Sequence, residues 1–237
     1  MTTEEFSNEF DLAVNAYLPG GDTFDEYEKS AYLTKAQKQV VLQLYNSFEQ
    51  KEIVREFLAP LIRTAVIKNE YTGEETDLYA ITDLSHFYEL PDDLWLITFE
   101  EVVVNSNGKC LENKRLSVSP TTQDKLSKVM GNPFKGPNDN RALRLNIADN
   151  IVEIIAKYDL KRYIVRYIKK LEPIILTRLT DGTSIDGKVE RTECELHESL
   201  HQDILNIAVA MALQTRRAIQ QQPVKQPEQQ QNQEQNV

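Results

Sequence analysis

The sequence predicts an α+β fold with N-terminal helices, a central antiparallel β-sheet region, a long C-terminal helix and a disordered Gln-rich tail. Three observations predict it. Apolar residues recur at three- and four-residue steps in the first 48 residues. From residue 78 to 176, β-branched and aromatic runs are separated by short turn-forming segments instead of helix-length connections. From Glu195 the apolar period is helical again.

Residues 2–18 are expected to form the first helix. Thr2 or Thr3 supplies its N-cap, and acidic residues follow in the first turn, where the helix dipole favours them. Pro19-Gly20-Gly21 ends the helix. A single apolar stripe runs along it, made of Phe6, Phe10, Ala13, Val14 and Tyr17.

A second, longer helix is expected over residues 24–45, because its apolar positions keep the helical spacing. Residues 52–67 are apolar but ambiguous. Pro60 interrupts any helix there, since proline has no backbone N–H and its ring clashes with the preceding turn.

The middle of the chain is expected to contain about six strands. They are predicted at residues 78–84, 94–104, 109–118, 142–147, 151–157 and 162–176. Pro91-Asp92-Asp93 forms a turn before the second strand, and Asn105-Ser106-Asn107-Gly108 is typical of a hairpin turn after it. A short helix at 120–130 and a loop at 132–138 separate the third strand from the fourth.

Four regions are therefore expected along the chain: helical 1–50, mainly β 51–195, a C-terminal helix 196–218 that packs on the domain, and a flexible tail 219–237. Nine of the last nineteen residues are Gln and two are Pro, so the tail has too little apolar surface to order itself.

The composition excludes several classes of function. A net charge of -10 and a pI near 4.9 argue against wrapping nucleic acid, which needs clustered Lys and Arg, although an acidic conduit can still let DNA slide. No segment is long and apolar enough to cross a bilayer, and the acidic N-terminus is unlike a signal peptide. Cys110 and Cys194 are too few and too far apart for a disulfide framework or thiolate metal site, so free thiols are expected.

His197-Glu198-Ser199-Leu200-His201 is the one pattern that resembles a catalytic centre. On a helix the two histidines share a face, and Glu198 stands where a zinc hydrolase places its general base. A third ligand is missing, because Ile204 and Ile207 occupy the positions of the extended motif. The preferred interpretation is that both histidines flank the core stripe of the helix.

Other possible ligand residues are better explained as turns. Ile185-Asp186-Gly187 is expected to be a turn in which Gly187 takes a positive φ, and Asp181-Gly182 is expected to be another. The paired carboxylates Asp92 and Asp93 belong to the turn before the second strand. The sequence thus predicts no catalytic, cofactor-binding or metal-ligating residue. A zinc-dependent hydrolase that uses His197, Glu198 and His201 is the alternative.

The charge is distributed unevenly. Eight acidic residues precede residue 31 against the single base Lys29, whereas seven bases lie between Lys157 and Arg178 against Asp159 and Glu172. These are either two solvated faces of one fold or two surfaces that meet between copies. In the second case the acidic end of one copy contacts the basic segment of the next, and the contacts can close a ring.

Several segments are similar to a family of virion proteins from crAss-like bacteriophages of gut Bacteroides hosts. The resemblance extends from about Glu5 to about Leu213 and is carried by five phrases: EFSNEFDLAVNAY, FDEYEKSAYLTKAQKQVVLQLYNS, ELPDDLWLITFEEVV, YIVRYIKKLEPIIL and SIDGKVERTECELHESLHQDILNIAVAMAL. These phrases identify kinship and are not catalytic motifs. The Gln-rich tail has no matching phrase.

The resemblance implies a structural protein of the particle that is not an enzyme, namely a head-to-tail connector or ring protein near the portal. It implies a homo-oligomeric ring, commonly of twelve copies, that contacts the portal protein and other tail or ring proteins. DNA would pass through the channel without specific binding, and no membrane would be involved. The protein would be assembled in the host cytoplasm and would reside in the virion.

Overall fold

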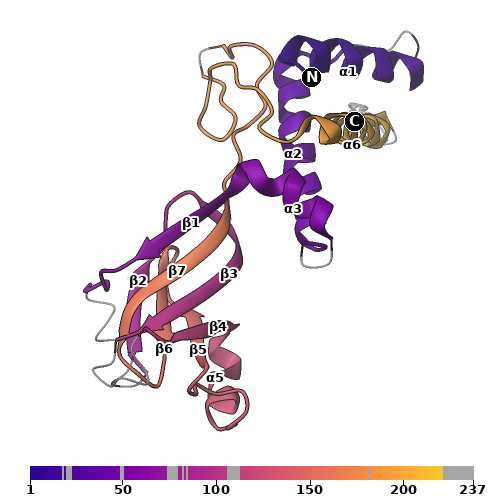
Figure 1. Ribbon diagram of the computed structural model, residues 1–237. Coiled ribbons are helices and arrows are strands. Elements are labelled where there is room, and N and C mark those ends of the chain that lie inside the picture. Colours follow the sequence, from indigo (N-terminus) through magenta and orange to yellow (C-terminus); the bar gives the residue numbers. More distant parts are fainter. Residues whose placement is uncertain are drawn as a thin grey trace, which may run out of the picture. The chain divides into compact units, whose positions relative to one another are not determined.

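A computed structural model describes residues 1–17, 19, 23–48, 51–73, 80–81, 83, 85–105, 113–180 and 182–220 (Figure 1). The chain forms two compact units. Met1–Phe57 together with Glu172–Val237 make a helical unit, and Leu58–Leu171 make a sheet unit. The helical unit is therefore discontinuous in sequence. The four regions expected along the chain remain a prediction, and all but the first two residues of the expected tail, 219–237, lie outside the described residues.

The helical unit contains α1 (Thr3–Tyr17), α2 (Glu26–Tyr45), α3 (Glu52–Leu58), the 3₁₀ turn η2 (Glu198–Leu200) and α6 (His201–Gln220). Side chains fix the first turns of α1 and α2. Thr2 Oγ1 accepts from the Glu5 amide at 3.2 Å, while Glu5 Oε2 accepts from the Thr2 amide at 2.8 Å. Asp25 and Glu28 make the same reciprocal pair at the start of α2. The predicted cap and both predicted N-terminal helices are confirmed.

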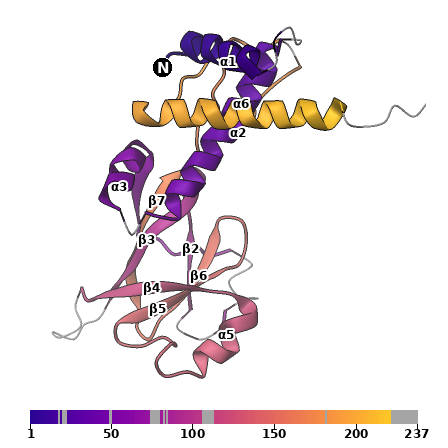
Figure 2. The same cartoon turned by 90° about the vertical axis from the view of Figure 1, so that its right-hand side faces the viewer.

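Helix α6 contacts both α1 and α2, and Figure 2 shows it crossing α2 as one long helix. The apolar stripes predicted for these helices meet there and form the core of the unit. The most deeply buried members are Phe6 and Phe10 of α1, Leu33, Ala36 and Val41 of α2, and Ile204, Ala208 and Ala212 of α6.

The segment between the sheet and α6 belongs to the helical unit and contains isolated bridges instead of a strand. The strand predicted to end at residue 176 ends at Lys169, and the chain then runs beside α2. Pro173, which cannot donate to a β ladder, follows soon after that end. Hydroxyl groups of α2 take the place of a neighbouring strand: Thr34 Oγ1 accepts from the Ile174 amide at 3.1 Å and Ser30 Oγ accepts from the Leu176 amide at 3.0 Å.

In its described residues the sheet unit contains η1 (Ala59–Leu61), seven strands and one α-helix. The strands are β1 (Ile62–Ile67), β2 (Ser85–Glu89), β3 (Leu94–Val104), β4 (Arg115–Thr121), β5 (Arg141–Asn146), β6 (Ile151–Ile155) and β7 (Leu160–Lys169). Their order is β1-β7-β3-β4-β5-β6-β2, and α5 (Gln123–Met130) lies between β4 and β5 in the chain.

The predicted antiparallel sheet is wrong at one pair, because β4 and β5 are parallel and the sheet is mixed. A parallel neighbour needs a crossover connection, and the residues between Thr121 and Arg141, which include α5, provide it. All other neighbouring strands are antiparallel.

The strand count differs from the prediction for local reasons. The ambiguous stretch 52–67 divides at Pro60 into helix α3, a 3₁₀ turn and strand β1, and this strand was not predicted. Most of the strand predicted at 78–84 lies outside the described residues, as do residues 106–108 of the predicted hairpin turn. The described strand β2 starts just after the first of these segments, at Ser85.

The sheet curls so that one of its faces encloses a core. Tyr88 of β2 and Tyr163 of β7 lie with ring centroids 5.4 Å apart, although four strands separate β2 from β7 in the sheet order. Buried inward-facing side chains join them, including Val102, Leu116, Ala142, Ile154 and Val165. The alternation of inward and outward side chains is what makes one face of this sheet apolar.

Helix α5 covers one part of the opposite, outward face. Leu126 packs there with Leu143, Leu145 and Ile155, which point away from the enclosed core. Outward side chains on β1 and β3 are left exposed, as with Val66 and Phe99. None of the helices in the described part of the chain combines the length and the apolar character that a membrane span requires.

Candidate interaction surfaces and the histidine pair

His197 does not lie on the helix that the sequence indicated. Its backbone is extended, with φ -58° and ψ 141°, and it caps the 3₁₀ turn η2. Its Nδ1 accepts from the Ser199 amide at 3.3 Å, and its ring lies 5.4 Å from that of Phe57. The predicted arrangement, with both imidazoles on one helical face, is therefore wrong, because the chain becomes α-helical only at His201.

His201 is buried at the first position of α6 and uses both ring nitrogens. Nδ1 lies 2.6 Å from the amino nitrogen of Met1, and Nε2 lies 3.0 Å from the carbonyl oxygen of Leu196. The ring also packs against Phe6, with centroids 5.4 Å apart. Burial lowers the pKa of His201, and the hydrogen bond to Leu196 opposes that change only in part. His201 thus joins the start of α6 to α1, which is a packing role.

A metal site at this position finds no support in the surrounding side chains. Among the described residues, no group of three or more His, Cys, Asp or Glu side chains is placed to hold a metal ion. A zinc site needs at least three protein ligands, and a nitrogen that already makes a short hydrogen bond is a poor ligand without rearrangement.

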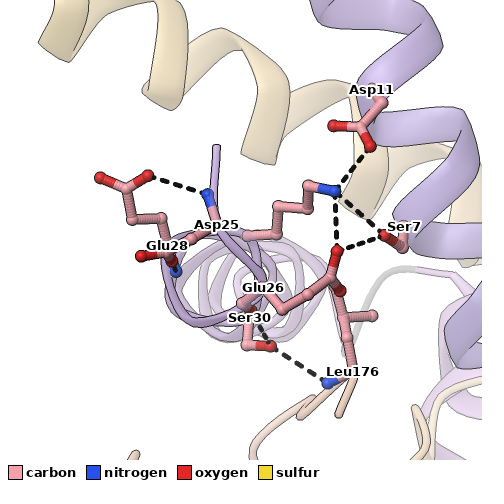
Figure 3. A network of polar contacts seen from close by, with 8 residues as sticks. Ser7, Asp11, Asp25, Glu26, Glu28, Ser30 and Leu176 are labelled. Atoms are coloured by element: carbon pink, nitrogen blue, oxygen red, sulfur yellow. Dashed lines mark hydrogen bonds and ion pairs between the residues drawn. The ribbon is translucent and has the colours of Figure 1, made fainter. Parts of the chain in front are cut away.

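Lys29 explains why one base lies among the N-terminal acids. Its side chain is only 4% exposed, and Nζ lies 2.6 Å from Asp11 Oδ2 and 2.8 Å from Glu26 Oε1 (Figure 3). Nζ also donates to Ser7 Oγ at 3.1 Å. Burial lowers the pKa of Lys29, but the two carboxylates raise it by more, so the net pKa lies above its ordinary value. The buried ammonium therefore joins α1 to α2 and forms ion pairs with two of the acids.

A second buried ionic cluster lies inside the curled sheet. Tyr163 donates to Glu100 Oε2 at 2.6 Å, and Arg144 Nε lies 3.0 Å from the same oxygen. Burial raises the pKa of Glu100, while Arg144 and Tyr163 oppose that rise. Because these groups contact one another in the core of the sheet unit, the cluster connects β3, β5 and β7.

The remaining candidate carboxylates act in turns, as predicted. Asp92 Oδ1 accepts from Asn150 at 2.8 Å, and Asp93 Oδ1 accepts from the Tyr167 hydroxyl at 2.8 Å. Asp186 and Gly187 both have positive φ, and Asp186 pairs with Lys38 at 2.7 Å. The positive φ predicted for Gly187 is confirmed, because a residue without a Cβ adopts it readily.

Cys194 carries a free thiol. Burial raises its pKa to about 11, so it remains protonated at neutral pH and is a weak nucleophile. Cys110 and Asp181 lie outside the described residues.

The two units differ in net charge. The helical unit contains 21 acidic and 11 basic residues, whereas the sheet unit contains 16 of each. The formal charge of -10 is therefore carried by the helical unit alone. The charge asymmetry in the sequence thus corresponds to a division between the two units.

Helix α1 exposes a stripe on the side opposite its core residues. The exposed members are Glu5, Asn8, Leu12, Asn15 and Ala16. Leu12 is 72% exposed at the centre of this stripe. Leu12 is absent from the apolar stripe predicted for the helix, because its position is out of step with Phe6 and Phe10. Its place on the surface could be expected from that spacing, but a role in contacts could not.

A hollow of about 480 Å³ lies between α1 and α6 in the same unit. Its walls include Ala13 and Tyr17 of α1 and Val209, Leu213 and Arg217 of α6. The hollow and the exposed Leu12 thus lie on two different parts of the α1 surface.

The outward face of β1, β7 and β3 is a further exposed surface. Val66 is 48% and Phe99 53% exposed, and Arg166 is exposed between these strands. Register places Arg166 opposite Phe99 on one side and opposite Thr64 on the other. The alternation of residues in the sequence does not predict that Phe99 points outward, because register shifts in β3 change which side chains face the core.

Comparisons with known proteins identify similar chains over nearly the whole sequence. The family described as "Phage tail ring protein 3/4" matches residues 1–223, a range that includes all described residues of both units. The chain is 39% identical over 223 residues to "Ring protein 3" of Bacteroides phage crAss001, which covers 90% of this chain and 95% of that protein. It is 31% identical over 229 residues to "Ring protein 4/5" of the same phage, at 90% and 92% coverage.

Proposed function

The chain belongs to the phage tail ring protein 3/4 family, and from that premise we propose that it is a head-to-tail connector subunit that forms a homo-oligomeric ring around the DNA channel. Membership makes it a structural ring protein of a phage virion. The proposal adds its position near the portal, its contacts with portal and other tail or ring proteins, and a closed ring that is commonly of twelve copies.

The observation that carries the proposal is the extent of the similarity. It covers the helical unit and the sheet unit together, in relatives whose printed names describe ring proteins. A partial match to one unit would support only a shared module. A match over both supports the same role in assembly.

Physical features of the chain are consistent with a closed ring. Head-to-tail rings need two different surfaces on each subunit, so that the front of one copy fits the back of the next. The helical unit carries all of the net negative charge, and each unit exposes a distinct set of apolar side chains. Complementary surfaces of that kind favour one register over others.

The acidity of the chain also suits contact with DNA that must move. A protein that binds DNA tightly neutralises phosphates with clustered Lys and Arg, whereas this chain has a net charge of -10. We therefore propose that DNA passes the ring without specific binding during genome ejection, and that assembly takes place in the host cytoplasm. No catalytic role is proposed for His197, Glu198 or His201, because described contacts of both histidines hold the start of α6 in place.

Native mass spectrometry of the full chain, alone and mixed with its cognate portal protein, tests the proposal. We expect a discrete metal-free oligomer, either in the chain alone or on the portal. A chain that remains monomeric under both conditions would contradict the ring. A monomer that carries one zinc ion per chain and ignores the portal would instead favour the hydrolase alternative.

A further inference from the structure

We propose that helix α1 of one copy docks on the outward face of β1, β7 and β3 of the next copy, with Leu12 against Phe99 and Glu9 near Arg166. This interface rests on the proposed ring and specifies which surfaces of neighbouring subunits meet. The occupant of the sheet face is therefore a second copy of this chain.

The sheet face offers an apolar surface with positive charge. Phe99 and Val66 are exposed, and Arg166 projects from β7 between their strands. Glu101, an acidic residue on β3, is neutralised by Arg115, whose NH1 lies 2.5 Å from its carboxylate. Among the described residues no carboxylate forms an ion pair with Arg166. An exposed aromatic residue beside an available Arg is the composition that protein interfaces favour.

Helix α1 offers the complementary pattern. Leu12 is 72% exposed in the centre of the outer stripe, and the half-buried Glu9 lies one helical turn before it. The other acids of this helix are already engaged: Asp11 with Lys29, Glu4 with Arg191 at 3.6 Å, and Glu5 with the Thr2 amide. Within the part of the chain that the structure describes, the carboxylate of Glu9 forms no ion pair. Glu9 is therefore the acid available to a partner.

The distance between Leu12 and Glu9 on α1 matches the distance between Phe99 and Arg166 on the sheet. Side chains three residues apart on a helix are separated by about 5–6 Å between Cβ atoms. Residues directly opposite on neighbouring strands have Cβ atoms about 4.5–5.5 Å apart, and Arg166 and Phe99 are such a pair. When Leu12 contacts Phe99, Glu9 can thus reach Arg166 without distortion of either backbone. Opposite charge fixes the direction of the helix on the sheet.

The difference in net charge between the two units adds a long-range electrostatic contribution to this contact. The helical unit carries -10 and the sheet unit is neutral overall, so the contact of a helical unit with a neighbour's sheet unit avoids the repulsion between two helical units. The contact is also heterologous, since it uses a different surface on each copy. Repetition of such a contact closes a ring when the rotation between copies allows it.

Disulfide crosslinking tests the contact directly. Leu12→Cys and Phe99→Cys are placed in a chain in which Cys110→Ser and Cys194→Ser remove the native thiols. We expect mild oxidation of the double variant to give a ladder of covalent oligomers. A mixture of the two single variants should give only dimers, which shows that the bond forms between copies. Phe134→Cys replaces Phe99→Cys as the matched control, because Phe134 is 84% exposed in the same unit.

The outcomes separate this interface from the ring itself when native mass spectrometry is run on the same samples. A ladder with Leu12→Cys and Phe99→Cys but not with Phe134→Cys supports the contact. Oligomers that form without that ladder, or with an equal ladder in the control, overturn the interface and leave the ring intact. Samples that stay monomeric, alone and on the portal, and give no crosslink overturn both.

A charge-reversal cycle provides a second test that does not depend on cysteine chemistry. Glu9→Arg or Arg166→Glu alone should weaken self-association about tenfold, and the double variant should recover most of that loss. Lys125→Glu on α5 is the control for a change of charge at an exposed site in the sheet unit. Equal losses in all three single variants, with no recovery in the double variant, would refute a direct pairing of Glu9 with Arg166.

Discussion

The sequence around His201 suggests a catalytic metal site, whereas in the structure the residue is part of the packing between α1 and α6. The sequence places it in a pattern shared with zinc hydrolases, yet its ring lies against Phe6 and bonds to the Leu196 carbonyl. The decisive property is burial, which disfavours the protonated ring. The same burial gives the residue a measurable effect on stability.

The stability contributed by His201 should decrease on acidification. Because its folded pKa is lowered, the unfolded chain takes up a proton near its ordinary pKa of about 6.5 while the folded chain resists. The free energy of unfolding should therefore fall between pH 7.5 and pH 5.5, as measured by urea denaturation. His201→Gln should lose this component of the pH dependence.

The matched control is His197→Gln, which changes an exposed histidine of the same segment. It should keep the pH dependence of the unmodified chain. Burial raises the pKa of Glu100, so its contribution to stability changes with pH in the opposite direction. Because Glu100 is present in all three proteins, its effect cancels in the comparison. An identical pH dependence in His201→Gln and the unmodified chain would contradict the structural account of His201.

At the scale of elements, α2 shows how side-chain hydroxyls replace a strand. Thr34 Oγ1 accepts from the Ile174 amide and donates to the Ile174 carbonyl, and Ser30 Oγ accepts from the Leu176 amide. Both hydroxyls are buried, so their partners have no water to bond instead. This segment is ordered by a helix and not by a β ladder.

Removal of these hydroxyls should loosen the segment that they hold. The double variant Ser30→Ala/Thr34→Val leaves the Ile174 and Leu176 amides without acceptors, at a cost of about 1–3 kcal/mol for each buried group. Hydrogen exchange followed by mass spectrometry should show that residues 172–180 exchange faster in the double variant than in the unmodified chain. Exchange in the strands should not change. Ser47→Ala is the control, because its hydroxyl bonds to carbonyl oxygens of the preceding turn. Unchanged exchange in the double variant would contradict this role.

At the scale of the whole molecule, the two units differ in how the chain builds them. The sheet unit is one continuous segment with its own enclosed core and buried ionic cluster. The helical unit needs both ends of the chain, since α6 completes the core against α1 and α2. A continuous segment with a complete core satisfies the condition for independent folding.

Residues 58–171 expressed alone should therefore fold, whereas residues 1–57 alone should not. The single Trp of the chain, Trp95, lies in β3 and reports on the sheet unit by fluorescence. We expect a cooperative urea transition for residues 58–171 and non-cooperative behaviour in circular dichroism for residues 1–57. A sheet segment that is unfolded in isolation would show that its core is incomplete without the helical unit.

Much of the local structure was predictable because it depends on residues close in sequence. The cap at Thr2, strand β3 and the turns at Asp92-Asp93 and Asp186-Gly187 follow from side-chain chemistry and glycine geometry within a few residues. The α+β class and the kinship with phage ring proteins also followed from the sequence. Strand β1 could not be predicted, because its apolar run is compatible with both the helical and the strand period.

The fold class, the helices and strands with strong periodicity, the uneven charge and the family are all evident in the amino-acid sequence. The parallel pairing of β4 and β5, the place of residues 172–200 in the helical unit and the burial of His201 are evident only in the folded chain. The structure also shows that Leu12 and Phe99 are exposed. The physical reason is that propensity and capping act over one or two turns, whereas strand direction and burial depend on contacts between residues far apart in the chain.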